Sequence, residues 1–185
     1  SLSSISAKAS RELMQLGGGA MGLALGTEFR REDYLFDPNP TIQTGDISGY
    51  GGNFLVTDRS RRVAALFSEL NLPVLKGLEF NAAVRWDKYE GVGNATTPKA
   101  SVRWQPVPQV VLRAAVGKGF RAPSLQDLYL PQTIGVTTPG LSDPLRCPTT
   151  GARTDCSTQF AILNGGNPAL TPEKSVNKTL GVVLS

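Results

Sequence analysis

The sequence of 185 residues has no histidine and only two cysteines, Cys147 and Cys156. The absence of histidine excludes the common Ser-His-Asp and Cys-His catalytic triads, and no G-x-S-x-G motif is present. Two thiols without histidine are also too few for a Cys/His zinc site. We therefore expect a protein that is not an enzyme, and we assign it no cofactor.

Long hydrophobic runs are absent as well. No stretch approaches the roughly 18 apolar residues of a membrane-spanning helix, which excludes a helical membrane protein. No signal peptide precedes the first residues, SLSSISAK, which already have the character of a strand, as do the last, GVVLS. We therefore expect an internal piece of a longer protein.

A concentrated basic surface is also missing. The net charge is +4, but lysine and arginine are mostly scattered through the chain, apart from Arg59, Arg61 and Arg62. No basic face interleaved with aromatic residues is present, and such a face is what nucleic-acid binding requires. We therefore expect no nucleic-acid partner.

The two cysteines lie close together in a polar stretch rich in proline, glycine and threonine. A disulfide between Cys147 and Cys156 would close a small loop and contribute about 2–3 kcal/mol to stability. It would also indicate an oxidising compartment outside the cytoplasm. Two free thiols in a loop are the alternative, and the residues alone leave both possibilities open.

The most informative pattern that is present is an alternation of apolar and polar residues. In Leu78–Lys88, Phe80 and Val84 share one side with Trp86, whereas Asn81 lies on the other side. Successive side chains of a strand point to opposite faces, so this segment predicts a strand with one apolar and one polar face. Both a half-buried sheet of a soluble protein and a membrane barrel around a watery lumen give this pattern.

The same alternation recurs in several segments and predicts seven strands. We place them at residues 3–14, 20–36, 62–75, 78–90, 97–105, 109–120 and 173–184. The connections after the first, third and fifth strands are tight, and those after the second (37–61) and sixth (121–172) are long. Strands that cross a membrane need about 9–11 residues, whereas soluble strands average about 5–6. We therefore expect an all-β, antiparallel up-and-down meander that forms part of a transmembrane barrel.

Charged side chains fall on the polar faces of the predicted strands. A charge ladder on a solvated wall explains them better than paired catalytic carboxylates do. Gly17, Gly19 and Gly22 fit G-x-G-x-x-G, but the strand-like alternation that follows favours a hairpin turn over a dinucleotide site. The residues that we expect to face the lumen are Glu69, Glu79, Arg85, Asp87, Lys99, Arg103 and Arg113.

A specific resemblance begins at Gly117. The segment GKGFRAPSLQDLYLP resembles the "FRAPS…LY" segment of TonB-dependent outer-membrane receptors, where a strand ends and a long extracellular loop begins. Further segments resemble that family in the same order, from about Glu12 to the end of the chain. They are ALGTEFRRE ("G-x-E-x-R"), AALFSELNLPVL ("A-x-F-x-E-x-x-x-P"), FNAAVRWDKYEGVGNATTPKASVRWQPV ("R-x-D-x-Y…PK…R-W-x-P") and GNPALTPEKSVNKTLGV ("G-N-P-x-L-x-P-E-x-S").

The resemblance implies a 22-stranded barrel blocked by an N-terminal plug, in the outer membrane of a Gram-negative bacterium. Residues 1–185 would then be a partial barrel domain of about seven strands, without the plug and the remaining strands. Such receptors import a scarce large ligand: a siderophore, cobalamin or an oligosaccharide. The implied partners are outer-membrane lipid, the plug in cis, this ligand, and TonB, which binds ahead of the plug in the missing N-terminal region.

Ligand capture in such a receptor would come from the long loops, and a disulfide would reduce the ordering cost of the largest loop. One alternative is a soluble or surface-displayed β-sandwich that binds a glycan or a protein through its loops. It predicts that the apolar face carrying Phe80 and Val84 is buried in protein. The candidate ligand-binding residues are Arg121, Gln126, Tyr129, Gln132 and Asn164.

Overall fold

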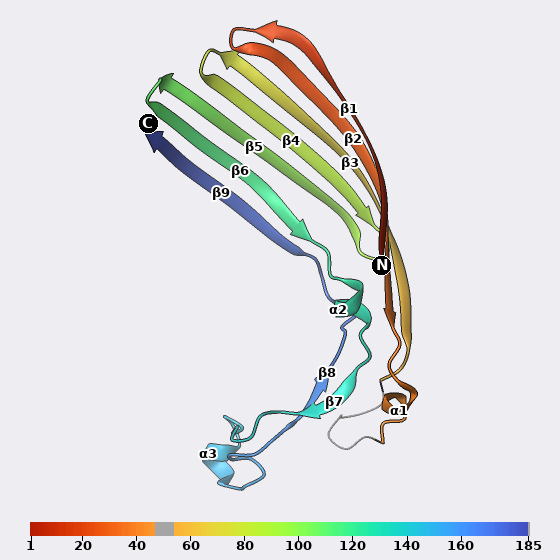
Figure 1. The fold of residues 1–185 in the computed structure, drawn as a ribbon. Helices are drawn as coiled ribbons and strands as arrows, with labels where there is room; N and C mark the ends of the chain where they lie inside the picture. The colour runs from red at the N-terminus through yellow and green to blue at the C-terminus, as the bar shows by residue number, and fades with distance from the viewer. Residues whose placement is uncertain (47–53, 185) are drawn as a thin grey trace. The chain divides into compact units, whose positions relative to one another are not determined.

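The computed structural model describes residues 1–46 and 54–184. Its main element is one antiparallel sheet of seven strands in the order β1-β2-β3-β4-β5-β6-β9 (Figure 1). Six of the strands follow one another directly along the chain, so the sheet is the expected up-and-down meander. Their bounds are β1 (Leu2–Leu16), β2 (Gly19–Phe36), β3 (Thr57–Leu75), β4 (Leu78–Tyr89), β5 (Gly93–Val107), β6 (Val110–Arg121) and β9 (Glu173–Leu184).

All seven predicted strands are present, and two of them begin about four or five residues earlier than predicted. The strand β5 starts at Gly93 instead of residue 97, because Lys88 pairs with Asn94 and Tyr89 with Gly93 in an uninterrupted ladder. The strand β3 starts at Thr57 instead of residue 62. Residues 47–53 of the predicted loop at 37–61 lie outside the described residues.

The register gives the sheet one polar and one apolar face. Glu79 pairs with Arg103, and Arg103 pairs in turn with Arg113, so this charged row crosses three strands. One residue further along, Phe80 pairs with Val102 on the opposite face. The seven charged residues expected to face a lumen therefore share one side of the sheet.

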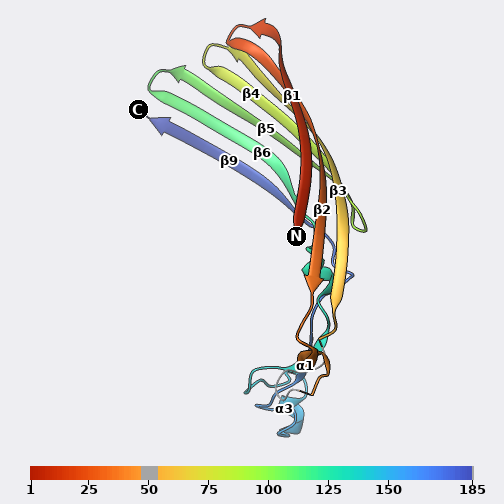
Figure 2. The ribbon, with the colours of Figure 1, turned by 45° about the vertical axis from the view of Figure 1, so that its right-hand side comes forward.

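The sheet is a single curved layer, and no second layer of the described residues covers its apolar face (Figures 1 and 2). Leu66 is 57% exposed on this face and Leu180 is 84% exposed. A β-sandwich would bury these side chains against a second sheet, so the structure does not favour the sandwich alternative. No helix among the described residues is long and apolar enough to cross a membrane.

The segment between β6 and β9, which we expected to be a plain loop, contains short elements. They are α2 (Leu125–Tyr129), β7 (Thr133–Val136), α3 (Cys147–Thr150) and β8 (Ala161–Asn164), and a further helix, α1 (Pro40–Gln43), lies between β2 and β3. The strands β7 and β8 pair as an antiparallel hairpin. By its contacts the chain forms two compact units: a sheet unit (1–33, 60–123 and 171–185) and a loop unit (34–59 and 124–170).

Gly26 shows how tightly side chains pack on the polar face of the sheet unit. A Cβ atom at Gly26 would lie 2.1 Å from Cζ of Phe67 on the neighbouring strand. The ring of Phe67 also lies between two cations, with Nζ of Lys8 and Cζ of Arg85 5.9 and 5.7 Å from its centroid. The absence of a side chain at Gly26 therefore makes room for a ring that two charges hold in place.

We predict that Gly26→Ala lowers the free energy of unfolding by about 1–3 kcal/mol, because the added methyl group must displace Phe67. Gly22→Ala is the matched control, since a Cβ at Gly22 has no atom within 4 Å. It should change stability by less than about 0.5 kcal/mol. Denaturant unfolding of the full-length protein in detergent, followed by tryptophan fluorescence, measures both. Equal stabilities of the two variants would contradict the packing described.

Candidate functional site

The polar face of β2, β3 and β4 carries a continuous ion-pair network in the sheet unit. Arg30 donates from Nε to Glu32 at 2.9 Å and from Nη1 to Glu28 at 3.2 Å. Its Nη2 donates to the hydroxyl of Tyr89, two strands away, at 3.4 Å. One guanidinium therefore joins two carboxylates of its own strand to a phenol on β4.

Arg85 extends the network across the sheet. Its Nε donates to Oδ1 of Asp87 at 2.9 Å, and its Nη2 donates to Oε2 of Glu28 at 3.0 Å. Glu28 is thus shared by two arginines, and Asp87 is only 6% exposed. A buried carboxylate is costly unless it is paired, and here each one accepts from a guanidinium.

Arg61, at the loop end of the network, is 5% exposed. Its guanidinium donates to the Glu32 carboxylate from Nε and Nη2, and its Nη1 donates to the backbone carbonyl of Pro123 at 2.8 Å. Its Cζ also lies 5.3 Å from the ring centroid of Tyr89. Because Pro123 lies two residues after the end of β6, this contact positions the point where the chain leaves the sheet.

The network contains residues that define two of the family motifs quoted above. Glu28 and Arg30 belong to "G-x-E-x-R". The motif "R-x-D-x-Y" contributes Arg85, Asp87 and Tyr89. Sequence reasoning missed Arg61 and Glu32, although alternation along their strands could have placed both on the polar face. The carboxylates of the network are all paired with arginine, which suits a structural role and not acid–base chemistry.

The charged residues expected to face a lumen are placed along this same polar face. Outside the network, Glu79 accepts a hydrogen bond from Asn71 at 2.9 Å, and Arg103 donates to Gln105 at 2.9 Å. Lys99 lies opposite Ala83. These contacts are spaced along the sheet, and they give no convergent cluster that would bind one small ligand.

Four of the five candidate ligand-binding residues belong to the loop unit. Gln126 and Tyr129 lie on α2, Gln132 precedes β7, and Asn164 ends β8, where it pairs with Thr133. Arg121 is separate: it ends β6 in the sheet unit, with an exposed ion pair to Glu173 at 3.5 Å.

Contacts within the loop unit give these side chains different roles. Gln132 donates from Nε2 to the carbonyl of Gly166 at 2.8 Å, so its amide supports the turn before β9. Cζ of Arg59 lies 5.4 Å from the ring centroid of Tyr129. Gln126 and Asn164 are exposed. Contact of these residues with a ligand stays a prediction.

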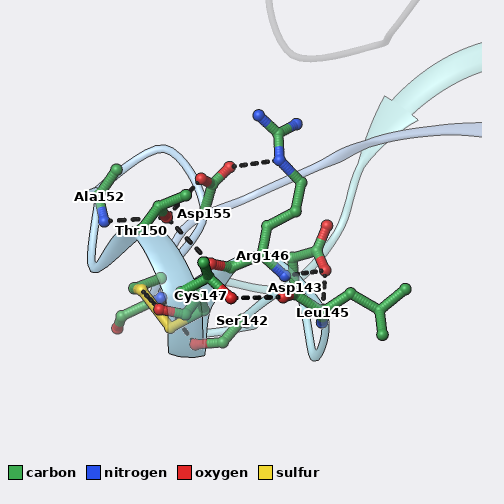
Figure 3. The surroundings of a disulfide bond; sticks show 11 residues. Ser142, Asp143, Leu145, Arg146, Cys147, Thr150, Ala152 and Asp155 are labelled. Carbon is green, nitrogen blue, oxygen red and sulfur yellow. Dashed lines mark hydrogen bonds and ion pairs between the residues drawn. A yellow bond between two sulfur atoms is a disulfide. The ribbon is translucent and has the colours of Figure 1, made fainter.

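Cys147 and Cys156 form a disulfide in the loop unit, with their Cα atoms 5.1 Å apart (Figure 3). The turn before it is held by Asp143, which accepts from the backbone N–H of Arg146 at 3.0 Å and of Leu145 at 2.8 Å. These bonds hold the pKa of the Asp143 carboxyl below its ordinary value. The stabilisation is present above the unfolded-state pKa and is lost only as the pH falls through the lowered folded-state pKa.

The hairpin of β7 and β8 presents an apolar surface that sequence reasoning missed. Ile134 pairs with Leu163, and Val136 lies on the same face. The exposed fractions of these three residues are 64%, 66% and 64%. Strands of four residues are too short for alternation to be recognised, so no periodic signal marked this surface.

Comparison with known proteins identifies the family. The family described as TonB dependent receptor-like, beta-barrel, matches residues 4–185, and the chain therefore belongs to the TonB-dependent receptors. Members of this family are outer-membrane β-barrel transport proteins of Gram-negative bacteria.

Two curated relatives are siderophore receptors by name. The ferric enterobactin receptor of Pseudomonas aeruginosa is 30% identical over 170 residues, which cover 88% of this chain and 20% of that receptor. The probable TonB-dependent siderophore receptor PirA of Acinetobacter baumannii is 30% identical over 168 residues, covering 86% of this chain and 20% of that protein. The chain thus spans about a fifth of the length of these relatives.

Solved structures agree with this assignment. A variant of the P. aeruginosa ferric enterobactin receptor (PfeA), in complex with enterobactin, is similar with a TM-score of 0.71 and 26% identity. The match covers 100% of this chain and 25% of that one. The siderophore receptor PirA of P. aeruginosa shares the fold, with a TM-score of 0.68 at 21% identity, over 100% of this chain and 29% of that one.

We predict that Arg61→Ala lowers the free energy of unfolding by about 2–4 kcal/mol, because it removes one of the two arginines that donate to Glu32 and leaves the buried carbonyl of Pro123 without its donor. Arg62→Ala is the matched control, since Arg62 is exposed on the opposite face. It should cost less than about 0.5 kcal/mol. Denaturant unfolding of the full-length receptor in detergent measures both, and equal losses would show that Arg61 is not the anchor described.

Proposed function

We propose that this chain forms part of the wall and one long loop of an outer-membrane receptor that imports a ferric siderophore into the periplasm. The polar face lines the passage and contacts the plug, the apolar face meets lipid, and TonB supplies the energy through the region ahead of the plug. The observation that carries this proposal is the family match over residues 4–185, together with two siderophore receptors at 30% identity.

The geometry supports a passive role for the sheet. Its polar face is occupied by paired charges such as Glu28 with Arg85, which give a hydrated wall without a reactive group. Its apolar face has no protein cover among the described residues, as expected for a surface that meets lipid. Ligand selection is therefore assigned to the loop unit.

Within the loop unit, the exposed apolar face of the β7–β8 hairpin is the surface best suited to ligand contact. Ile134, Val136 and Leu163 form a flat patch on paired strands. Siderophores that chelate iron through aromatic rings present flat apolar faces, and such faces gain most from a patch of this kind. The disulfide between Cys147 and Cys156 lies in the same loop unit and limits its disorder, which lowers the entropy cost of binding.

Uptake by whole cells tests the proposed function. We would express the full-length receptor in an iron-starved Gram-negative host that lacks its own siderophore receptors, and supply labelled ferric enterobactin, a ferric hydroxamate, cobalamin and an oligosaccharide separately. We expect TonB-dependent uptake of a ferric siderophore and none of cobalamin or oligosaccharide. Uptake of cobalamin or oligosaccharide alone would overturn the siderophore assignment.

The hairpin contact gives a second prediction. Ile134→Asp should weaken binding of the ferric siderophore by about tenfold or more, because a charge replaces an apolar contact. Leu145→Asp is the matched control: Leu145 is 84% exposed in the loop unit but lies outside the hairpin. Titration of the purified receptor with the transported siderophore measures both dissociation constants. Equal affinities of the two variants would show that the hairpin does not contact the ligand.

A further inference from the structure

The apolar face of the sheet carries basic residues close to the loop end of its strands. The register places them on this face, since Lys88 pairs with Ala64 and Lys174 with Phe120. The tight turns after β1, β3 and β5 lie at the opposite end of the sheet (Figure 1). We call the following five residues the cationic belt: Arg31 of β2, Arg62 of β3, Lys88 of β4, Lys118 of β6 and Lys174 of β9.

Carboxylates compensate only part of the belt. Asp33 accepts a hydrogen bond from Nε of Arg31 at 2.7 Å, and Glu90 accepts one from the backbone N–H of Arg62 at 3.1 Å. Within residues 1–46 and 54–184, the side chains of Arg62 and Lys88 form no ion pair. Cations beside an apolar surface are costly when they lack a counter-charge, so this belt attracts anionic groups.

A cleft of about 730 Å³ lies at the belt, entirely within the sheet unit. Its lining includes the cations Arg31, Arg62 and Lys88 and one carboxylate, Glu90, so positive charge is in excess. The apolar side chains that line it on the same face are Ile5, Phe29 and Ala64. An amphiphile with an anionic head and a hydrocarbon tail matches both the cationic and the apolar part, whereas a free anion matches the cationic part alone.

We propose that this cleft binds a phosphate-bearing lipid of the outer leaflet of the membrane. The phosphate accepts hydrogen bonds from the guanidinium of Arg62 and the ammonium of Lys88, which are the side chains that bind phosphate best. An acyl chain lies along Ile5 and Phe29, where it continues the lipid that covers the rest of the apolar face. The proposal rests on the proposed function, because it requires this face to lie in the membrane.

Binding of lipid A, a phosphorylated and acylated disaccharide, to the full-length receptor in detergent tests this site. Native mass spectrometry would compare lipid A carrying both phosphates with enzymatically dephosphorylated lipid A, and inorganic phosphate would be added as a competitor. The test variant is Arg62→Glu with Lys88→Glu. The control is Arg11→Glu, since Arg11 lies on the same face opposite Leu23, outside the cleft.

We expect the wild-type receptor to bind the phosphorylated lipid at least about tenfold more tightly than the dephosphorylated lipid. The double variant should lose this preference, and the Arg11 variant should keep it. An unchanged preference in the double variant would overturn the site. Equal binding of the two lipids would leave only apolar contact, and efficient displacement by inorganic phosphate would indicate a free-anion site; either result also overturns the proposal.

Two further measurements distinguish a variant that does not fold from a wrong lipid site, and a wrong lipid site from a wrong proposed function. The neutral variant Arg62→Gln with Lys88→Gln replaces the charge-reversed one if the latter does not fold, and the wild-type comparison of the two lipids needs no variant. Siderophore uptake by wild-type cells is independent of the lipid measurement. Normal uptake without a phosphate preference would contradict the lipid site alone, whereas absence of any siderophore uptake would contradict the proposed function.

Discussion

The structure depends on one constraint. A single-layer sheet must pair its backbone N–H and C=O groups between neighbouring strands, and it must present its two faces to two different surroundings. Seven paired strands satisfy the backbone groups between them. The alternation along each strand then separates side chains such as Phe80 and Asn81 onto opposite faces. Because no second layer of the described residues covers the apolar face, that face needs an environment other than water. A bilayer supplies it, and in a bilayer the backbone must be paired in this manner.

The polar face solves the complementary problem of holding charges close together. Arginines alternate with carboxylates from β2 to β4, so that each buried charge meets an opposite one. Arg61 links this pattern to the backbone at Pro123, where the chain leaves the sheet. The ring of Phe67 over Gly26 fills the space between charged residues of adjacent strands. The result is a wall of paired charges from which a long loop departs at a defined point.

Alternation was sufficient to predict the sheet from the sequence, because a period of two persists through twelve or more residues of strands such as Leu78–Tyr89. The short elements of the loop were not predictable in this way, since Thr133–Val136 and Ala161–Asn164 are each four residues long. The sequence alone leaves the state of the two cysteines open, because proximity along the chain does not decide between a disulfide and two thiols.

The contacts of individual side chains were also beyond sequence reasoning. Arg61 falls in the predicted loop 37–61, and only the structure shows that it belongs to β3 and meets Glu32 and Pro123. Gln132 is a candidate ligand-binding residue because it belongs to the long loop, and only the structure shows that its amide donates to the carbonyl of Gly166. Such contacts depend on neighbours that are far apart in the sequence, and a single sequence carries little information about them.

The most direct test of the central claim is to label single cysteines in the full-length receptor in membranes, on a background with Cys147 and Cys156 replaced. One set of labels lies on the apolar face, at Leu66, Phe80, Val102 and Leu112; the other lies on the polar face, at Glu69, Asn81, Arg103 and Arg113. The account predicts quenching by lipid-soluble quenchers for the first set alone. Absence of quenching in both sets, or equal quenching in both, would contradict it.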